Sequence, residues 1–168
     1  MFERLLPKQI DTTGRSNRFA TLLLIPILTL KLLMSINAMV MTRFVASTAD
    51  GIPLDRYGPE GAQAVMAFFS VWGMEQALIA SIGLLALVRY QALVPLAYVL
   101  LSIEHFGRKG FFLAHPFDRL GGQTGAGTMI NWALMIMLLA GLLFALFAKV
   151  RPTPERAIQP ALQDELRG

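Results

Sequence analysis

Four long runs of apolar residues constrain this chain more than any other feature. They cover about 19–41, 62–88, 91–112 and 128–148 of the 168 residues. A helix of about 20 apolar residues crosses the ~30 Å hydrocarbon core of a bilayer and satisfies its own backbone hydrogen bonds there. Membrane β-strands would instead alternate apolar and polar residues over about ten positions, and these runs do not. We therefore expect an all-α polytopic membrane protein in which four transmembrane helices form a bundle.

Composition agrees with a lipid environment, and the third run is the weakest of the four. Hydrophobic residues make up 55% of the chain and charged residues 15%, with a mean hydropathy of +0.55. The apolar part of the third run ends at Ile103, so a full crossing must carry Glu104 and His105 into the hydrocarbon. A re-entrant or interfacial segment is the alternative for this run, and a crossing helix is the interpretation that we favour.

Basic residues outside the runs predict the orientation. Nine lie on the side of the chain ends and five on the other side, counting Arg108 and Lys109 in the polar end of the third run. An excess of lysine and arginine marks the cytoplasmic side, so both termini are predicted to be cytoplasmic, with the protein in a bacterial-type plasma (inner) membrane. Attraction to anionic lipid accounts for the net charge of +4, and no nucleic acid is implied. We expect one transmembrane domain, 1–150, and a flexible cytoplasmic tail, 151–168, without a cleavable signal at the start.

Several classes of chemistry find no support in the sequence. The chain has no cysteine, which removes thiol relays, thiolate metal sites and iron–sulfur ligation. His105 and His115 are ten residues apart and do not form a ligand pair at helical spacing. We therefore expect no metal and no cofactor. No nucleophile with an orienting base is apparent either, so an autonomous enzyme is the interpretation favoured least.

Charged residues inside the runs fall at one depth. At ~1.5 Å per residue from the cytoplasmic face, Lys31 lies about 20 Å up the first helix, Glu75 about 21 Å up the second and Glu104 about 22 Å up the third. A lone lysine at that depth costs at least about 2.5–3.5 kcal/mol, so we expect Lys31 to meet Glu75 or Glu104. Arg108, four residues after Glu104, competes for it from the same helix face.

Three further polar residues complete the predicted intramembrane cluster. His105 belongs to the same layer, and Asn37 and Asn131 lie slightly above it, at about 27–29 Å. Two interpretations stay open. Either the charges fix how the helices pack, or they line a small outward-opening cavity that binds or passes a small molecule.

The hairpin MEQALIASIGLLALVRYQALVPLAYVLLS resembles the second and third helices of the DoxX-like four-helix membrane proteins. Those proteins tend to show a glutamate, a glycine-containing apolar helix and a basic residue at the turn, and Glu75, Gly83 and Arg89 stand at these places. Lys31 is similar to a lysine often found in the first helix of that family. Some members are associated with quinone-linked sulfur oxidation or with membrane redox complexes, so the resemblance implies a quinone ligand.

Three hypotheses follow for function. The first, which leads, is a bundle protein that binds or passes a small molecule through an outward polar pocket. The second is a structural or assembly subunit, in which a ridge of small residues around Gly73, or a lipid-facing stripe, would pack against another membrane subunit or a second copy. The third is a quinone-linked redox subunit that depends on another protein for its electron partner.

Overall fold

A computed structural model describes residues 17–116, 119 and 126–147 of the chain. These residues form helices and turns, with no β-strand among them. The longest helices are α2 (Arg18–Val40), α4 (Pro59–Val88), α5 (Val94–Ala114) and α6 (Ala126–Phe147). The predicted tail, 151–168, lies outside the described residues, as does Ala148 at the end of the fourth predicted run.

Three of these helices, α2, α4 and α6, are long enough and apolar enough to cross a membrane. They support the assignment of a membrane protein by length and composition. Helix α5 is not among them, because Glu104, Arg108 and Lys109 lie within its second half. The third run is nevertheless a continuous helix of 21 residues, preceded by the short turn η3 (Gln91–Leu93).

Local sequence signals explain where the helices begin. The side chain of Asn17 accepts a hydrogen bond from the backbone N–H of Phe19 at 3.2 Å and so caps α2. Pro59 and Pro95 stand in the first turn of α4 and α5, where a missing N–H leaves no hydrogen bond unmade. At its 30 residues α4 is about 45 Å long, so it exceeds the ~30 Å hydrocarbon core.

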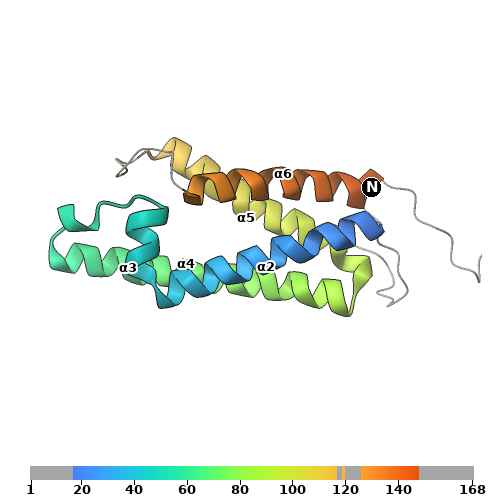
Figure 1. Cartoon of the computed structure of the whole chain (residues 1–168), viewed down its shortest axis with the longest axis horizontal. Coiled ribbons are helices and arrows are strands. Elements are labelled where there is room, and N and C mark those ends of the chain that lie inside the picture. Colours follow the sequence, from blue (N-terminus) through green and yellow to red (C-terminus); the bar gives the residue numbers. More distant parts are fainter. Residues whose placement is uncertain (1–16, 117–118, 120–125, 148–168) are drawn as a thin grey trace, which may run out of the picture.

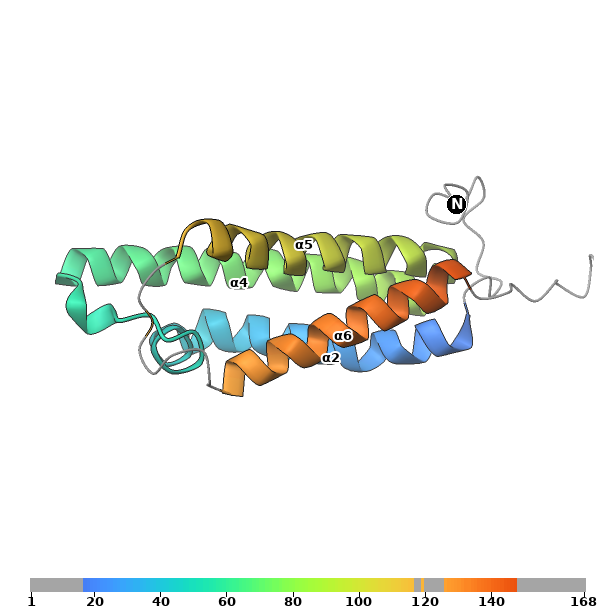
Figure 2. The same ribbon diagram turned by 90° about the horizontal axis from the view of Figure 1, so that it is seen from above.

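The long helices form a ring in which each packs against two neighbours, in the order α2, α4, α5, α6 and back to α2. Figure 1 shows α2 and α4 side by side, while α5 starts beside α4 and moves away from it toward α6. The same arrangement seen from above is in Figure 2. The start of α2 and the end of α6 share one end of the bundle, where the Phe19 and Phe144 rings lie 6.1 Å apart.

At that end the bundle is closely packed, and we call the part from there to the level of Leu28 the closed half. Its core consists of aliphatic side chains from all four long helices, among them Leu24, Leu101 and Leu138. The hydroxyl of Tyr98, fully buried, donates a hydrogen bond of 2.7 Å to the carbonyl of Ala20. This part of the molecule therefore buries apolar surface and satisfies its central polar group.

Glycines allow the helices to approach closely. A Cβ added at Gly73 on α4 would lie 3.0 Å from the Cβ of Ala38 and 3.1 Å from the carbonyl oxygen of Ser35, both on α2. Near the same place the Thr42 and Ser70 hydroxyls form a hydrogen bond of 2.9 Å. The small-residue ridge around Gly73 therefore serves the packing of α4 on α2 within this chain.

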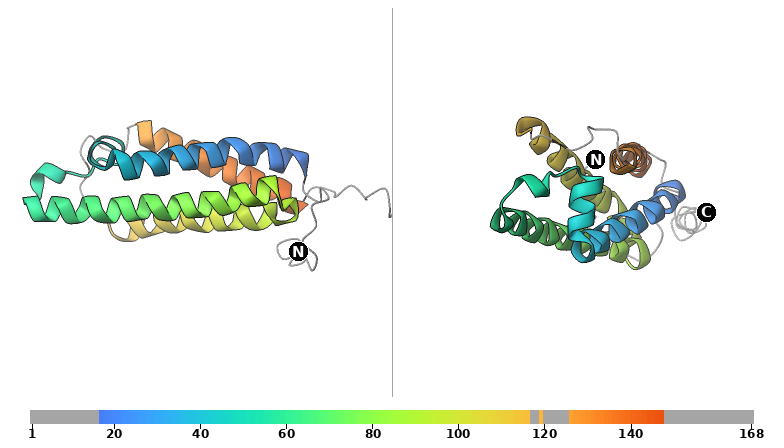
Figure 3. Two further views of the ribbon diagram at one scale, coloured as in Figure 1. Left: turned by 90° about the horizontal axis from the view of Figure 1, so that it is seen from below. Right: turned by 60° about the vertical axis from the view of Figure 1, so that its left-hand side comes forward.

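The other end of the bundle is capped by short helical turns. After Met41 the chain continues as α3 (Thr42–Phe44) and η1 (Val45–Ala49), then η2 (Leu54–Arg56) leads into α4. Figure 3 shows α3 and η1 turning across the end of the bundle. Gly127 at the start of α6 approaches this cap, since a Cβ there would lie 2.7 Å from the Ala49 carbonyl oxygen. We call the part from Lys31 to this cap the open half.

Candidate functional site

The lysine of the first helix pairs with the glutamate of the third. The Nζ of Lys31 on α2 donates a hydrogen bond to Oε2 of Glu104 on α5, and both side chains are buried. Seventy-three residues separate them in the sequence. The depth argument left Glu75 and Glu104 open as partners, and in this structure the partner is Glu104.

The guanidinium group of Arg108 contacts three other side chains. Its Nε lies 3.8 Å from the other Glu104 oxygen, and its Nη2 donates a hydrogen bond of 3.0 Å to Oδ1 of Asn131 on α6. Its guanidinium carbon also stands 4.8 Å from the centre of the Trp72 ring on α4. Asn131 in turn donates to the Gly127 carbonyl at 2.8 Å, so its amide is oriented toward the guanidinium.

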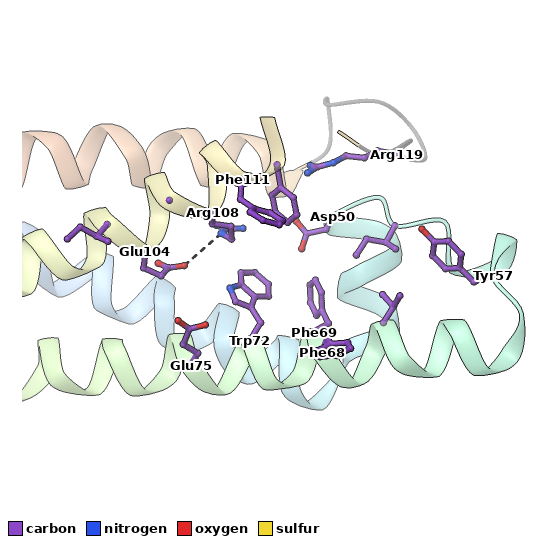
Figure 4. Close-up of a pocket in the computed structure, with 15 residues that line it drawn as sticks. Asp50, Tyr57, Phe68, Phe69, Trp72, Glu75, Glu104, Arg108, Phe111 and Arg119 are labelled. Carbon is purple, nitrogen blue, oxygen red and sulfur yellow. Dashed lines mark ion pairs between the residues drawn. The ribbon is translucent and has the colours of Figure 1, made fainter. Parts of the chain in front are cut away.

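Glu75 occupies a different place from the one that a pairing with Lys31 requires. Its side chain is exposed, and it makes no hydrogen bond or ion pair with the part of the chain that the structure describes. It lies on α4 across from Glu104 and Arg108 (Figure 4). Glu75 therefore faces the Lys31–Glu104–Arg108 group from the opposite helix without joining it.

A cavity of about 640 Å³ separates these two walls. Glu75, Glu104 and Arg108 lie at its deep end, while Asp50 and Arg119 lie near the cap (Figure 4). The rest of its lining is largely aromatic or aliphatic and consists of Ile52, Tyr57, Val65, Phe68, Phe69, Trp72, Ile103, Phe111 and Phe112, with Gly107 on α5. A mostly apolar pocket of this size with a few converging polar groups is the usual form of a small-molecule site.

Several side-chain polar atoms are buried without a hydrogen bond to any described residue. They are Oε1 of Gln76, Oγ of Ser102, Oε1 of Glu104, Nε of Arg108 and both ring nitrogens of His105. Leaving such an atom unpaired costs about 1–3 kcal/mol, and native proteins usually partner them with ordered water or a ligand. Glu104 and Arg108 line the cavity, so two of these unpaired atoms belong to its deep end.

The predicted cluster is brought together only in part. Lys31, Glu104, Arg108 and Asn131 are in contact as described above, and His105 is fully buried, with the Asn131 backbone near its ring but outside hydrogen-bonding geometry.

Asn37 does not join this cluster, and its placement there was wrong. Its side chain is exposed and forms no hydrogen bond with a described residue. The reason is rotation: six residues after Lys31, a helical position has turned by about 240° and faces away from the layer that Lys31 enters.

Sequence reasoning missed the outer part of the cavity. Phe68, Trp72 and Glu75 recur at helical spacing on one face of α4, which is a signal that the sequence contained. Asp50 gave no such signal, because it reaches the cavity only through the turn of η1 across the bundle end. Burial there raises the pKa of the Asp50 carboxyl, although the positive charge of Arg108 opposes the change.

The described residues contain no group of three or more histidine or acidic side chains placed to hold a metal ion. Comparison with known proteins gave no match to a family model, a curated protein or a solved structure. The resemblance of the α4–α5 hairpin to DoxX-like proteins therefore stays a prediction.

Proposed function

We propose that this chain is a four-helix protein of the plasma (inner) membrane that binds a small, largely apolar molecule in an outward-facing cavity. The observation that carries the proposal is the cavity of about 640 Å³, which is aromatic along its walls and polar at its deep end. In this arrangement α5 crosses the membrane with Glu104 and Arg108 turned toward the bundle interior and the cavity, as intramembrane charges generally are.

The orientation rests on the basic residues and on the closed half. Helix α2 begins and α6 ends at the same end of the bundle, and the α4–α5 turn with Arg89 lies there too. The excess of basic residues predicted for that side makes it cytoplasmic in the proposed topology. The open half, with the cavity, then faces outward.

A purely structural role accounts for fewer of the observations. An ion pair that only fixes helix packing needs Lys31 and Glu104, but it requires neither an exposed Glu75 nor a cavity beside the pair. The assembly-subunit alternative called for the Gly73 ridge or a lipid-facing stripe to contact another chain, and the first of these surfaces is occupied, since Gly73 packs against Ala38 and Met39 of α2. Ligand binding is therefore the function that the geometry favours.

Gly107 offers a direct test. It lines the cavity, and a Cβ built there meets no atom within 4 Å, so Gly107→Leu fills the cavity without a backbone clash. Gly110 on the same helix is equally open but does not line the cavity, which makes Gly110→Leu the matched control. Both changes gain helix propensity to the same extent.

The readout is the fluorescence of Trp72, which lines the cavity. In nanodiscs, with Trp132→Phe removing the other tryptophan, the probe 11-bromo-1-undecanol should quench Trp72 in a saturable way. Gly107→Leu should weaken this quenching by about tenfold in apparent affinity, or about 1.4 kcal/mol, and Gly110→Leu should leave it unchanged. Quenching that rises linearly with the probe in all variants reports bilayer partition alone and would overturn the proposal.

A further inference from the structure

We infer that the ligand of this cavity is an uncharged amphiphile whose hydroxyl head lies between Glu75 and Arg108. This inference rests on the proposed function and adds the chemical class of the ligand. Three features of the cavity carry it: the balance of charge at the deep end, the contacts that its cations already make, and the donor and acceptor groups that remain.

Charge at the deep end is balanced without a ligand. Lys31 and Arg108 supply two positive groups, and Glu75 and Glu104 supply two negative ones. A charged head brought into a mostly apolar site must be compensated there, or it costs several kcal/mol. An uncharged head leaves the balance intact.

The cations of the site are already engaged. Lys31 is paired with Glu104, and Arg108 contacts Glu104, Asn131 and the face of Trp72. An anionic head could accept only from the N–H groups of Arg108 that these contacts leave free, and it would then face the carboxylates of Glu75 and Glu104. A cationic head would find Glu75 open, but it would then stand across the cavity from Arg108.

What remains suits a group that both donates and accepts. A carboxylate only accepts hydrogen bonds and a guanidinium only donates them. Glu75 on α4 and Arg108 on α5 line opposite walls of the deep end (Figure 4). A hydroxyl placed between them donates to the first and accepts from the second, whereas an ether oxygen only accepts.

The remaining lining suits an apolar tail. Between the deep end and the cap the walls carry Phe68, Phe69, Trp72, Phe111 and Phe112. Such aromatic surfaces take up hydrocarbon without directional demands. The ligand therefore has its head deep in the membrane and its tail directed toward the outer cap.

The test uses four probes that share one brominated eleven-carbon chain and differ in the head: a hydroxyl, a methyl ether, a sulfate and a trimethylammonium. Each is titrated in nanodiscs against the parent and against Gly107→Leu, both in the Trp132→Phe background. The difference in Trp72 quenching between these two proteins removes the contribution of bilayer partition. The alcohol should bind about tenfold more tightly than the other three.

A charge-switch variant sharpens the test. Glu75→Gln keeps a group that donates and accepts but leaves the site with one excess positive charge, so the sulfate should gain at least about tenfold relative to the parent. Glu60→Gln, an exposed position in the first turn of the same helix and outside the cavity, is the control and should change no affinity.

The outcomes separate the inference from the proposed function. Equal binding of alcohol and ether, or tighter binding of either charged probe by the parent, overturns the inference and leaves a ligand-binding cavity in place. A Glu75→Gln protein that keeps the parent's order of affinities also overturns it. If no probe shows quenching that depends on Gly107, the proposed function fails, and the inference with it.

Discussion

The closed and open halves of the bundle contain the same helices but differ in how closely α4 and α5 pack. In the closed half, α4 and α5 lie together at their short turn, and aliphatic side chains from four helices fill the space between them. In the open half the two helices separate, since α5 follows α6 instead (Figure 1). The closed half of the bundle is therefore a packed core, and the open half contains a cavity.

Side-chain size explains much of this difference. Small buried residues of the closed half, such as Ala86 and Ala97, let α4 and α5 approach at that end. Toward the cap, the facing positions carry Trp72 and Phe69 on α4 and Arg108 and Phe111 on α5. Bulky rings and a bound guanidinium cannot interdigitate at the same spacing, so the helices diverge. If the proposed ligand binding holds, close packing and binding are assigned to different ends of one bundle.

The largest expected effect is in the open half, where removing one member of the buried ion pair leaves the other without a counter-charge. Glu104→Gln leaves Lys31 buried without its partner and should lower the free energy of unfolding by about 3–5 kcal/mol. Adding Lys31→Met to Glu104→Gln should restore at least half of this loss, because the ammonium group without a partner is then gone, while Arg108 keeps its contacts to Asn131 and Trp72. Thermal unfolding in nanodiscs measures both.

Glu75→Gln is the matched comparison for this cycle. Glu75 is exposed and unpaired among the described residues, so its neutralisation should change stability by no more than about 0.5 kcal/mol. If Glu75→Gln and Glu104→Gln destabilise the protein equally, Lys31 interacts with both carboxylates. The distinction between a paired Glu104 on α5 and an unpaired Glu75 on α4 is then wrong.

A smaller effect tests the closed half. Gly141 on α6 lies directly against the ring of Tyr98, and a Cβ added there would overlap that ring. Gly141→Ala should therefore cost about 1–3 kcal/mol, since the Tyr98–Ala20 hydrogen bond must shift. Gly110→Ala, where a Cβ meets open space, should be neutral or slightly stabilising. Equal stability of the two variants would show that the closed half is not tightly packed.

The smallest effect concerns pH and lies at the cap of the open half. Burial raises the pKa of the Asp50 carboxyl above its usual value of 3.8, so the folded protein binds this proton more tightly than the unfolded chain. The contribution of Asp50 to stability is then fully present below pH 3.8 and is lost as the pH rises through its raised pKa. Asp50→Asn should remove this loss, so the variant should become more stable relative to the parent as the pH rises.

The control for that experiment is Asp55→Asn, which removes an exposed pair with Arg43 on the same cap. A parallel rise in both variants would assign the effect to the overall charge of the cap and not to the burial of Asp50.

The sequence predicted the helical class and the layer of intramembrane charges, and the limits of that prediction have a physical cause. Counting residues along a helix gives depth, which is why Lys31 and Glu104 were placed at one level. Depth does not give the direction in which a side chain points, so Glu75 was left as an equal partner and Asn37 was placed in a layer that it faces away from. Those directions depend on how the helices rotate and cross once packed.

The outer part of the cavity was even harder to predict from the sequence. Its α4 wall follows a helical spacing that a search for aromatic periodicity would find, from Phe68 through Trp72 to Glu75. Asp50 and Ile52 line the cavity only because α3 and η1 turn across the end of the bundle. The sequence of 42–52 does not by itself predict the direction of that turn. The separation of α4 from α5, which opens the cavity, is a property of four helices together.

The pairing of Lys31 with Glu104 also has a consequence for how the protein is made. Seventy-three residues separate the two partners, and a ribosome adding roughly 5–20 residues per second needs about 4–15 seconds to synthesise them. In the proposed topology, α2 reaches the membrane before its counter-charge exists. Its leucines and isoleucines must therefore offset the cost of the ammonium group in the bilayer until α5 supplies Glu104.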